Sequence, residues 1–240
     1  MSYQSSSEEQ MWALKEFLAK TWKIIVAVIV IGLLAYYGWN YYQSNQVKKL
    51  EKMSDRYEQL VKQLDQTKPE SVNDLVAFAK EGDSVYNVFA DLFAAKFYIE
   101  VTKDYAGAQA LLTDALSKTK AEPVKSVINI RIARVQYQQN QYQESLATLD
   151  KVNNEAWEPV INEIRGDILT KMSRYAEAID AYKIALKSAA MISSEPNIKI
   201  KLNQAEYLQA KQTVEQDKQT AEEKAEQEDQ SKTETEENKN

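Results

Sequence analysis

The stretch YAEAIDAYKIA at residues 175–185 decides the fold, because its pattern occurs twice more upstream. Residues 105–115 read YAGAQALLTDA, and residues 142–152 read YQESLATLDKV. In each copy a tyrosine is followed by a small residue three positions later and by apolar residues seven and ten positions later. Apolar and small residues at this spacing lie on one face of an α-helix. The pattern therefore predicts three related helices, each the second helix of a helical hairpin.

Small residues also occur where the two helices of each hairpin must cross. In the expected register they are Ala133 and Gly166 on the first helices, and Ala108, Ser145 and Ala178 on the second helices. Hairpin one departs from the pattern, since Lys96 stands at the small position with Ala95 beside it. The copies are 37 and 33 residues apart, close to the period of about 34 residues of tetratricopeptide repeats. We expect a tetratricopeptide-like helical-repeat solenoid.

An apolar segment precedes the repeats. Residues 24–39 read IIVAVIVIGLLAYYGW, and no charged residue occurs between Lys23 and Lys48. Residues 22–42, with aromatic side chains at both ends, would form a helix of about 31 Å, which matches the bilayer core. We predict a transmembrane helix here, and hence an all-α protein with one N-terminal span. Lysines on both sides of the segment leave its orientation open.

Composition divides the chain into four parts. We expect an N-terminal segment at residues 1–21, the transmembrane helix at 22–42, the repeat domain at 43–210 and an acidic tail at 211–240. Residues 215–240 hold ten Asp and Glu against four Lys, which accounts for the net charge of −6 of the whole chain. A tail with so few apolar residues is predicted to be disordered. The neutral remainder argues against nucleic acid as a partner.

The absences in the composition exclude most enzymes. The chain has no cysteine and no histidine, and its five glycines are scattered. Thiolate chemistry, histidine-based triads and the common zinc sites are therefore excluded. Glu163 and Asp167 fall on one predicted helix face, where a solvated surface is the simplest interpretation. We expect no catalytic residues, no metal, no cofactor and no small-molecule substrate.

Stacked hairpins present a concave surface made by their first helices, and this surface is the candidate protein-binding site. The repeat register places the following residues on it: Phe93, Phe97, Glu100, Ile130, Arg134, Tyr137, Glu163 and Asp167. Phe93, Phe97 and Ile130 could instead belong to the core, and the sequence leaves this open. An apolar end next to a charged end suits an extended or helical peptide.

Several motifs resemble the YfgM family, the ancillary subunit of the Sec translocon. Residues 38–42 (GWNYY) are similar to the exit of its membrane helix, and residues 127–136 (VINIRIARVQ) are similar to its central helix. Further similar positions lie downstream, namely Leu149, Asp150, Trp157, Arg165, Gly166 and Asp167. The resemblance covers about residues 8–210, and the acidic tail lies outside it.

The resemblance implies a bacterial inner-membrane protein with a cytoplasmic N-terminus and a periplasmic repeat domain. It implies two partners, the Sec translocon subunits and a membrane-anchored periplasmic chaperone of the peptidyl-prolyl isomerase type. The expected function is that of a non-enzymatic adaptor that helps pass secreted proteins to periplasmic chaperones. The residues alone also allow a scaffold of another envelope complex, or a membrane-tethered regulator that holds a cytoplasmic factor by its N-terminal segment.

Overall fold

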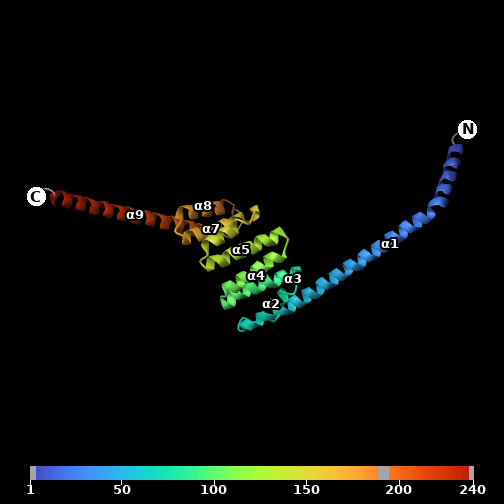
Figure 1. Ribbon diagram of the computed structural model, residues 1–240, viewed down its shortest axis with the longest axis horizontal. Coiled ribbons are helices and arrows are strands. Elements are labelled where there is room, and N and C mark those ends of the chain that lie inside the picture. Colours follow the sequence, from blue (N-terminus) through green and yellow to red (C-terminus); the bar gives the residue numbers. More distant parts are fainter. Residues whose placement is uncertain (1–3, 189–194, 238–240) are drawn as a thin grey trace. The chain divides into compact units, whose positions relative to one another are not determined.

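The computed structural model describes residues 4–188 and 195–237. Contacts within the chain divide it into two units, Met1–Gln59 and Leu60–Asn240. The first unit consists of helix α1 (Gln4–Lys62), which ends just inside the second unit (Figure 1). The segment 22–42, which the sequence predicts to cross the membrane, lies within this one helix. It is continuous because no proline interrupts the chain before Pro69.

The apolar segment of α1 has no protein cover. Every side chain from residue 22 to residue 42 is exposed. The part Met11–Lys62 is long and apolar enough to cross a membrane. A continuous apolar surface of this length is unfavourable in water, and a bilayer would cover it.

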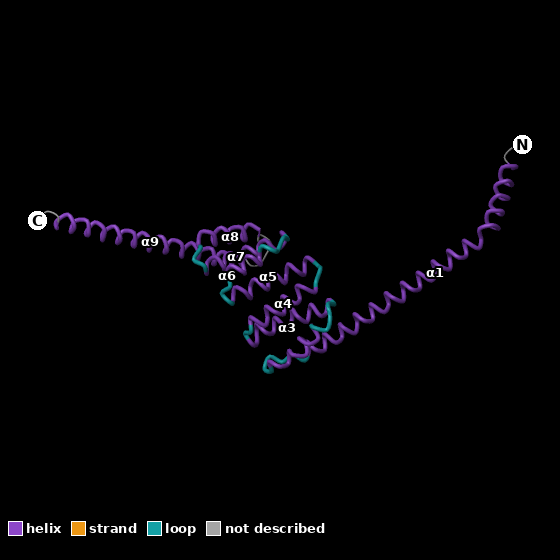
Figure 2. The backbone as a smooth tube through the Cα atoms, viewed as in Figure 1, coloured by secondary structure: helices purple, strands orange, loops and turns teal. Residues whose placement is uncertain are grey.

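The second unit is a series of helices, each packed against the next in the chain. In the described part of the chain, Figure 2 shows helices and loops without a strand. After the short turns of η1 (Pro69–Val72) the helices pair as successive hairpins. The elements are α2 (Asn73–Ala79), α3 (Val85–Phe97), η2 (Tyr98–Thr102), α4 (Tyr105–Lys118), α5 (Glu122–Gln138), α6 (Tyr142–Leu149), η3 (Glu155–Trp157), α7 (Glu158–Lys171), α8 (Tyr175–Ser188) and α9 (Glu195–Glu237).

The three hairpins are α3–α4, α5–α6 and α7–α8, and their turns share one backbone feature. The residue two positions before the tyrosine that begins each second helix has a positive φ: 56° at Lys103, 60° at Asn140 and 59° at Ser173. This left-handed conformation ends the first helix and reverses the chain. The same conformation at the same place in all three hairpins confirms the predicted repeat.

The small residues lie where the helices cross, as predicted. Ser145 Oγ of α6 donates a hydrogen bond to the carbonyl of Ala133 on α5 at 2.6 Å. Ala133 and Ser145 are both fully buried. On α7, Gly166 lies so close to the ring of Tyr182 of α8 that a Cβ would be 2.4 Å from its Cε1. Larger side chains at these positions would force the helices apart.

Hairpin one contains one residue more than the other two. The turn residue Lys103 lies eight positions after Ala95, whereas Asn140 lies seven positions after Ala133. The extra residue is taken up by η2, a π-helical turn, whose wider coil holds one residue more than an α-helical turn. Ala95, which is buried, therefore takes the small position of the pattern in place of Lys96, which is exposed. The register that we counted from the sequence is one residue off along α3.

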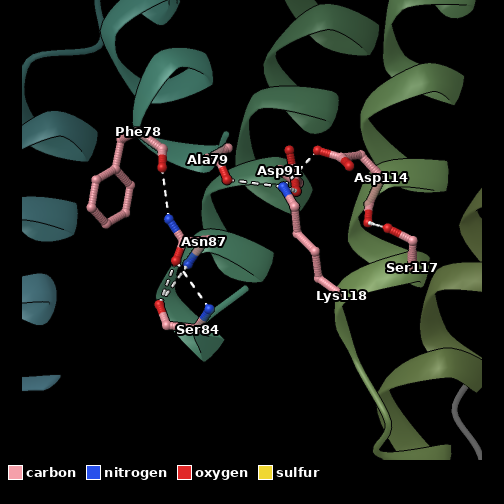
Figure 3. Close-up of polar contacts among 8 residues, drawn as sticks. All are labelled: Phe78, Ala79, Ser84, Asn87, Asp91, Asp114, Ser117 and Lys118. Atoms are coloured by element: carbon pink, nitrogen blue, oxygen red, sulfur yellow. Dashed lines mark hydrogen bonds and ion pairs between the residues drawn. The ribbon is translucent and has the colours of Figure 1, made fainter. Parts of the chain in front are cut away.

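Side chains of α3 and α4 hold the C-terminal end of α2 (Figure 3). Asn87 Nδ2 donates to the carbonyl of Phe78 at 2.7 Å, and Lys118 Nζ donates to the carbonyl of Ala79 at 2.9 Å. The last carbonyls of a helix have no partner within it, and a cation placed there is favourable. These two contacts attach α2 to the first hairpin.

The same lysine lies between two carboxylates. Lys118 Nζ is 2.7 Å from Asp91 Oδ2 and 2.5 Å from Asp114 Oδ2 (Figure 3). Burial raises the pKa of Asp91 above its usual range, and the ammonium of Lys118 opposes this only in part. Burial also disfavours the charged form of Lys118, but hydrogen bonds to Asp114 and Asp91 outweigh it and raise the pKa of Lys118. Lys118 is thus the charge that makes burial of Asp91 tolerable.

The acidic tail, which the sequence predicts to be disordered, continues α9 as a helix to Glu237. Near its start, Ile198 and Ala205 pack against α8 in the core of the third hairpin. From residue 211 to residue 222 every side chain is exposed, so packing does not explain the helix there. The reason is local, because the tail has no glycine or proline and is rich in Glu, Gln and Lys, which favour helix.

Candidate functional site

A cavity of about 500 Å³ lies on the face formed by the first helices of the hairpins. Its walls come from α3 and η2, α4, α5 and α7, and from the beginning of α9. They include eight apolar or aromatic side chains: Leu92, Ala95, Ile99, Tyr105, Leu112, Val135, Tyr137 and Ile164. The other lining residues are polar or charged: Lys96, Glu100, Arg131, Arg134, Gln138, Glu163, Asp167 and Lys201. The cavity is therefore a mixed groove, with apolar surface beneath charged groups.

Five of the eight candidate residues line this cavity: Glu100, Arg134, Tyr137, Glu163 and Asp167. The other three are Phe93, Phe97 and Ile130. Phe97 and Ile130 are 5% and 4% exposed and belong to the core. Phe93 is half-buried, with Lys96 Nζ 5.8 Å from the centre of its ring.

The extra residue in hairpin one explains the misplaced phenylalanines. Moving the register of α3 back by one residue replaces Phe93 and Phe97 with Leu92 and Lys96, and both of these line the cavity. Ile99 of η2 lines it as well. Apolar residues occur at both sets of positions, so hydrophobic periodicity alone does not distinguish the two registers.

At one end of the groove two carboxylates share one lysine. Lys201 Nζ of α9 is 2.7 Å from Glu163 Oε1 and 2.8 Å from Asp167 Oδ2. The hydroxyl of Tyr182 donates to Asp167 Oδ1 at 2.8 Å. Burial lowers the pKa of Lys201, but its hydrogen bonds to the two carboxylates outweigh this and raise its pKa above 10.5. The two carboxylates are thus held by the protein itself.

Among the side chains that the structure describes, no three acidic groups come together in a way that could hold a metal ion. At the α3 end of the groove, Lys96 Nζ lies 3.9 Å from Glu100 Oε2, on the exposed surface. Such an exposed pair contributes little to the stability of the fold.

The centre of the groove is positively charged. Arg131 and Arg134 of α5 both line the cavity and are exposed. Within the described ranges of the chain, neither guanidinium forms an ion pair or a hydrogen bond. Arg134 was a predicted candidate, whereas Arg131 lies next to a predicted position.

Lys201 is a residue of the groove wall that sequence reasoning missed. It comes from α9, outside the three repeats, and the residues 195–200 around it do not repeat the hairpin pattern. Only the packing of α9 against the last hairpin brings it to Glu163 and Asp167.

The comparisons with known proteins agree with this architecture. A family model described as a tetratricopeptide repeat-like domain matches residues 15–207. The chain is 30% identical over 203 residues to the ancillary SecYEG translocon subunit of Escherichia coli strain K12, and the match covers 85% of this chain and 98% of that protein. It is 29% identical over 204 residues to the protein of the same name from Aggregatibacter actinomycetemcomitans, and 26% identical over 204 residues to that from Haemophilus influenzae, each match covering 85% of this chain and 99% of the relative.

These relatives match nearly from end to end, and the family model covers the apolar helix and the hairpins together. The resemblance inferred from the sequence motifs is confirmed, and the acidic tail at 211–240 lies beyond the residues that the family model matches. The chain belongs to the family of ancillary SecYEG translocon subunits with a tetratricopeptide repeat-like domain.

Proposed function

We propose that this protein is a single-span inner-membrane adaptor that works beside the Sec translocon. Its repeat domain, on the periplasmic side, receives segments of secreted proteins and helps pass them to a membrane-anchored chaperone of the peptidyl-prolyl isomerase type. The observation that carries the proposal is the groove of about 500 Å³ across α3, α5 and α7, in a chain whose relatives are named translocon subunits. A groove with apolar walls and a charged rim suits a polypeptide segment.

The proposal assigns binding rather than catalysis to the groove. Its two carboxylates are held by Lys201 and Tyr182, which leaves neither of them placed as a free general base. The remaining charged groups of the wall are lysine and arginine cations and the exposed Glu100. These side chains can bind a polypeptide segment. They do not place a nucleophile beside a base, as covalent catalysis requires.

The proposed topology places the N-terminus in the cytoplasm, residues 22–42 in the bilayer and the repeats in the periplasm. Protease digestion of intact spheroplasts carrying an epitope after Asn240 tests it. Loss of the epitope before lysis, with a cytoplasmic marker protein still intact, is the expected result. Protection until lysis would place the repeats in the cytoplasm and would exclude the transfer to a periplasmic chaperone.

Site-specific photocrosslinking tests the groove. A photoreactive amino acid at Gln138, on the cavity wall, should form adducts with SecYEG subunits, secreted chains or the chaperone. The matched control places it at Lys183 of α8, which is exposed and lies outside the cavity wall. Equal adducts from both positions would show that the groove is not the binding surface. Adducts with proteins of another envelope complex, in place of these partners, would indicate the alternative scaffold.

A further inference from the structure

The two arginines at the centre of the groove differ from every other cation on its wall. Lys96 is paired with Glu100, and Lys201 is paired with two carboxylates. Arg131 and Arg134 have no partner in the described part of the chain. Three residues apart on α5, they lie on one helix face. The groove thus presents two adjacent positive charges that the fold itself leaves unused.

The surroundings strengthen these charges. Val135 follows Arg134 directly on α5, and Leu92, Ala95 and Ile99 of the first hairpin line the same cavity. Apolar walls lower the local dielectric constant, so a charge in the groove acts over a longer distance than on an open surface. An anionic group that enters between these walls would meet both guanidinium groups.

The acidic end does not offer a comparable site for a cation. Asp167 accepts hydrogen bonds from Lys201 and Tyr182, and Glu163 accepts one from Lys201. The two carboxylates and the lysine leave a net charge of about −1 that is spread over the cluster. The charges of the groove that lack a partner are therefore the two guanidinium groups, and the ligand that fits them is an anion.

We propose that the groove selects acidic polypeptide segments, in which carboxylates bind Arg131 and Arg134 while apolar side chains between them contact the α3 and α5 walls. This inference rests on the proposed function, since it names the class of segment that the protein-binding groove takes. A guanidinium binds a carboxylate through paired hydrogen bonds, which gives both strength and orientation. The occupant is an acidic segment of a partner protein, and the chain's own acidic tail is an alternative that the test separates.

The test measures peptide binding by the full-length protein in lipid nanodiscs. The probe is a fluorescent peptide of about twelve residues with alternating Leu and Glu, and its control has Gln in place of every Glu. Fluorescence anisotropy should show tighter binding of the Glu peptide, and the preference should weaken as salt screens the charges. Equal affinity for the two peptides would overturn the proposal without any variant.

Two double variants localise the effect. Arg131→Gln with Arg134→Gln should weaken the Glu peptide by about tenfold, because charge-assisted hydrogen bonds are lost, and should leave the Gln peptide unchanged. Both side chains are exposed, so the fold should be retained, and this is checked by thermal unfolding. Lys183→Gln with Lys187→Gln removes the same charge from exposed positions of α8 and should bind like the wild type. Equal loss in both pairs would show that only net charge matters.

A truncation separates the chain's own tail from a partner segment. A chain that ends at Ala210 should bind the Glu peptide as the full chain does. A several-fold gain in affinity after truncation would show that the tail occupies the groove, and would overturn the assignment to a partner.

Failure of this inference is distinguishable from failure of the proposed function. If crosslinks from Gln138 reach SecYEG subunits but the two peptides bind alike, the adaptor function stands and the acidic preference falls. If the Glu peptide depends on the arginines but no crosslinks reach the translocon or a chaperone, the preference stands and the adaptor function falls.

Discussion

Replacing Gly166 by alanine tests the closest contact in the third hairpin. The added Cβ would lie 2.4 Å from Cε1 and 2.6 Å from Cδ1 of Tyr182, whereas real Cβ contacts essentially never fall under 3.0 Å. The ring cannot move aside easily, because it is 2% exposed and its hydroxyl donates to Asp167. We therefore expect Gly166→Ala to destabilise the repeat domain.

Two opposing effects set the magnitude. Overpacking of a well-packed core costs about 1–3 kcal/mol. Alanine in place of glycine within a helix returns about 1 kcal/mol. The expected net change is a loss of up to about 2 kcal/mol, which corresponds to a Tm lower by up to about 8 °C for a domain of this size.

Thermal unfolding of the full chain in detergent, followed by circular dichroism, measures this change. The matched background is Tyr182→Val, which removes all three ring atoms near position 166. In that background the same alanine substitution should be neutral or stabilising, because the clash is gone while the helix preference remains. The assigned contact between Gly166 and Tyr182 would be refuted if Gly166→Ala still lowered the Tm in the Tyr182→Val background. It would also be refuted if Gly166→Ala alone raised the Tm.

The remaining predictions concern the first hairpin and the tail. Lys118→Met should destabilise the chain by about 3–5 kcal/mol, because it leaves the carboxyl of Asp91 buried without its cation. Lys125→Met removes an exposed pair with Glu122 and should cost only about 0–1 kcal/mol, and denaturant titration measures both variants. Burial raises the pKa of Asp91 in the folded state, so the contribution of this carboxyl to the free energy of unfolding is most favourable below pH 3.8 and declines as pH rises through the folded pKa. In unfolding experiments at several pH values, Asp91→Asn should remove this part of the pH dependence. The raised pKa of Lys118 stabilises the fold below pH 10.5, and this contribution should disappear as pH rises through the folded pKa. Ending the chain at Ala210 should change the Tm by less than about 2 °C, because the side chains of residues 211–222 are exposed. A larger drop in calorimetry would show that the tail packs on the fold.

The local pattern of the sequence was sufficient for the helices and for two of the three hairpins. Each second helix is located by a tyrosine, a small residue and apolar residues at fixed spacing. In the second and third hairpins the left-handed residue, Asn140 or Ser173, also lies seven positions after the small residue of the first helix. The apolar run before residue 43 likewise needs no tertiary information, because the nineteen consecutive uncharged residues 24–42 are favourably placed only in a membrane or a core.

The groove could be predicted only in part. Glu163, Asp167, Arg134 and Tyr137 follow from the repeat register, since the same positions of successive first helices face the same side. Phe97 was misplaced because the π-helical turn adds one residue to hairpin one, and both registers carry apolar residues along α3.

By itself, the sequence determined the helical repeat, the apolar span and the charge of the tail, because these depend on residues close together in the chain. Only the tertiary structure decided which charges are satisfied. Lys201 reaches Glu163 from a helix beyond the repeats, 38 residues away, and Lys118 reaches Asp91 from 27 residues away. How the hairpins stack also decides which charges stay unpaired. Arg131 and Arg134 are unpaired because the packing brings no acidic group of the described chain to them.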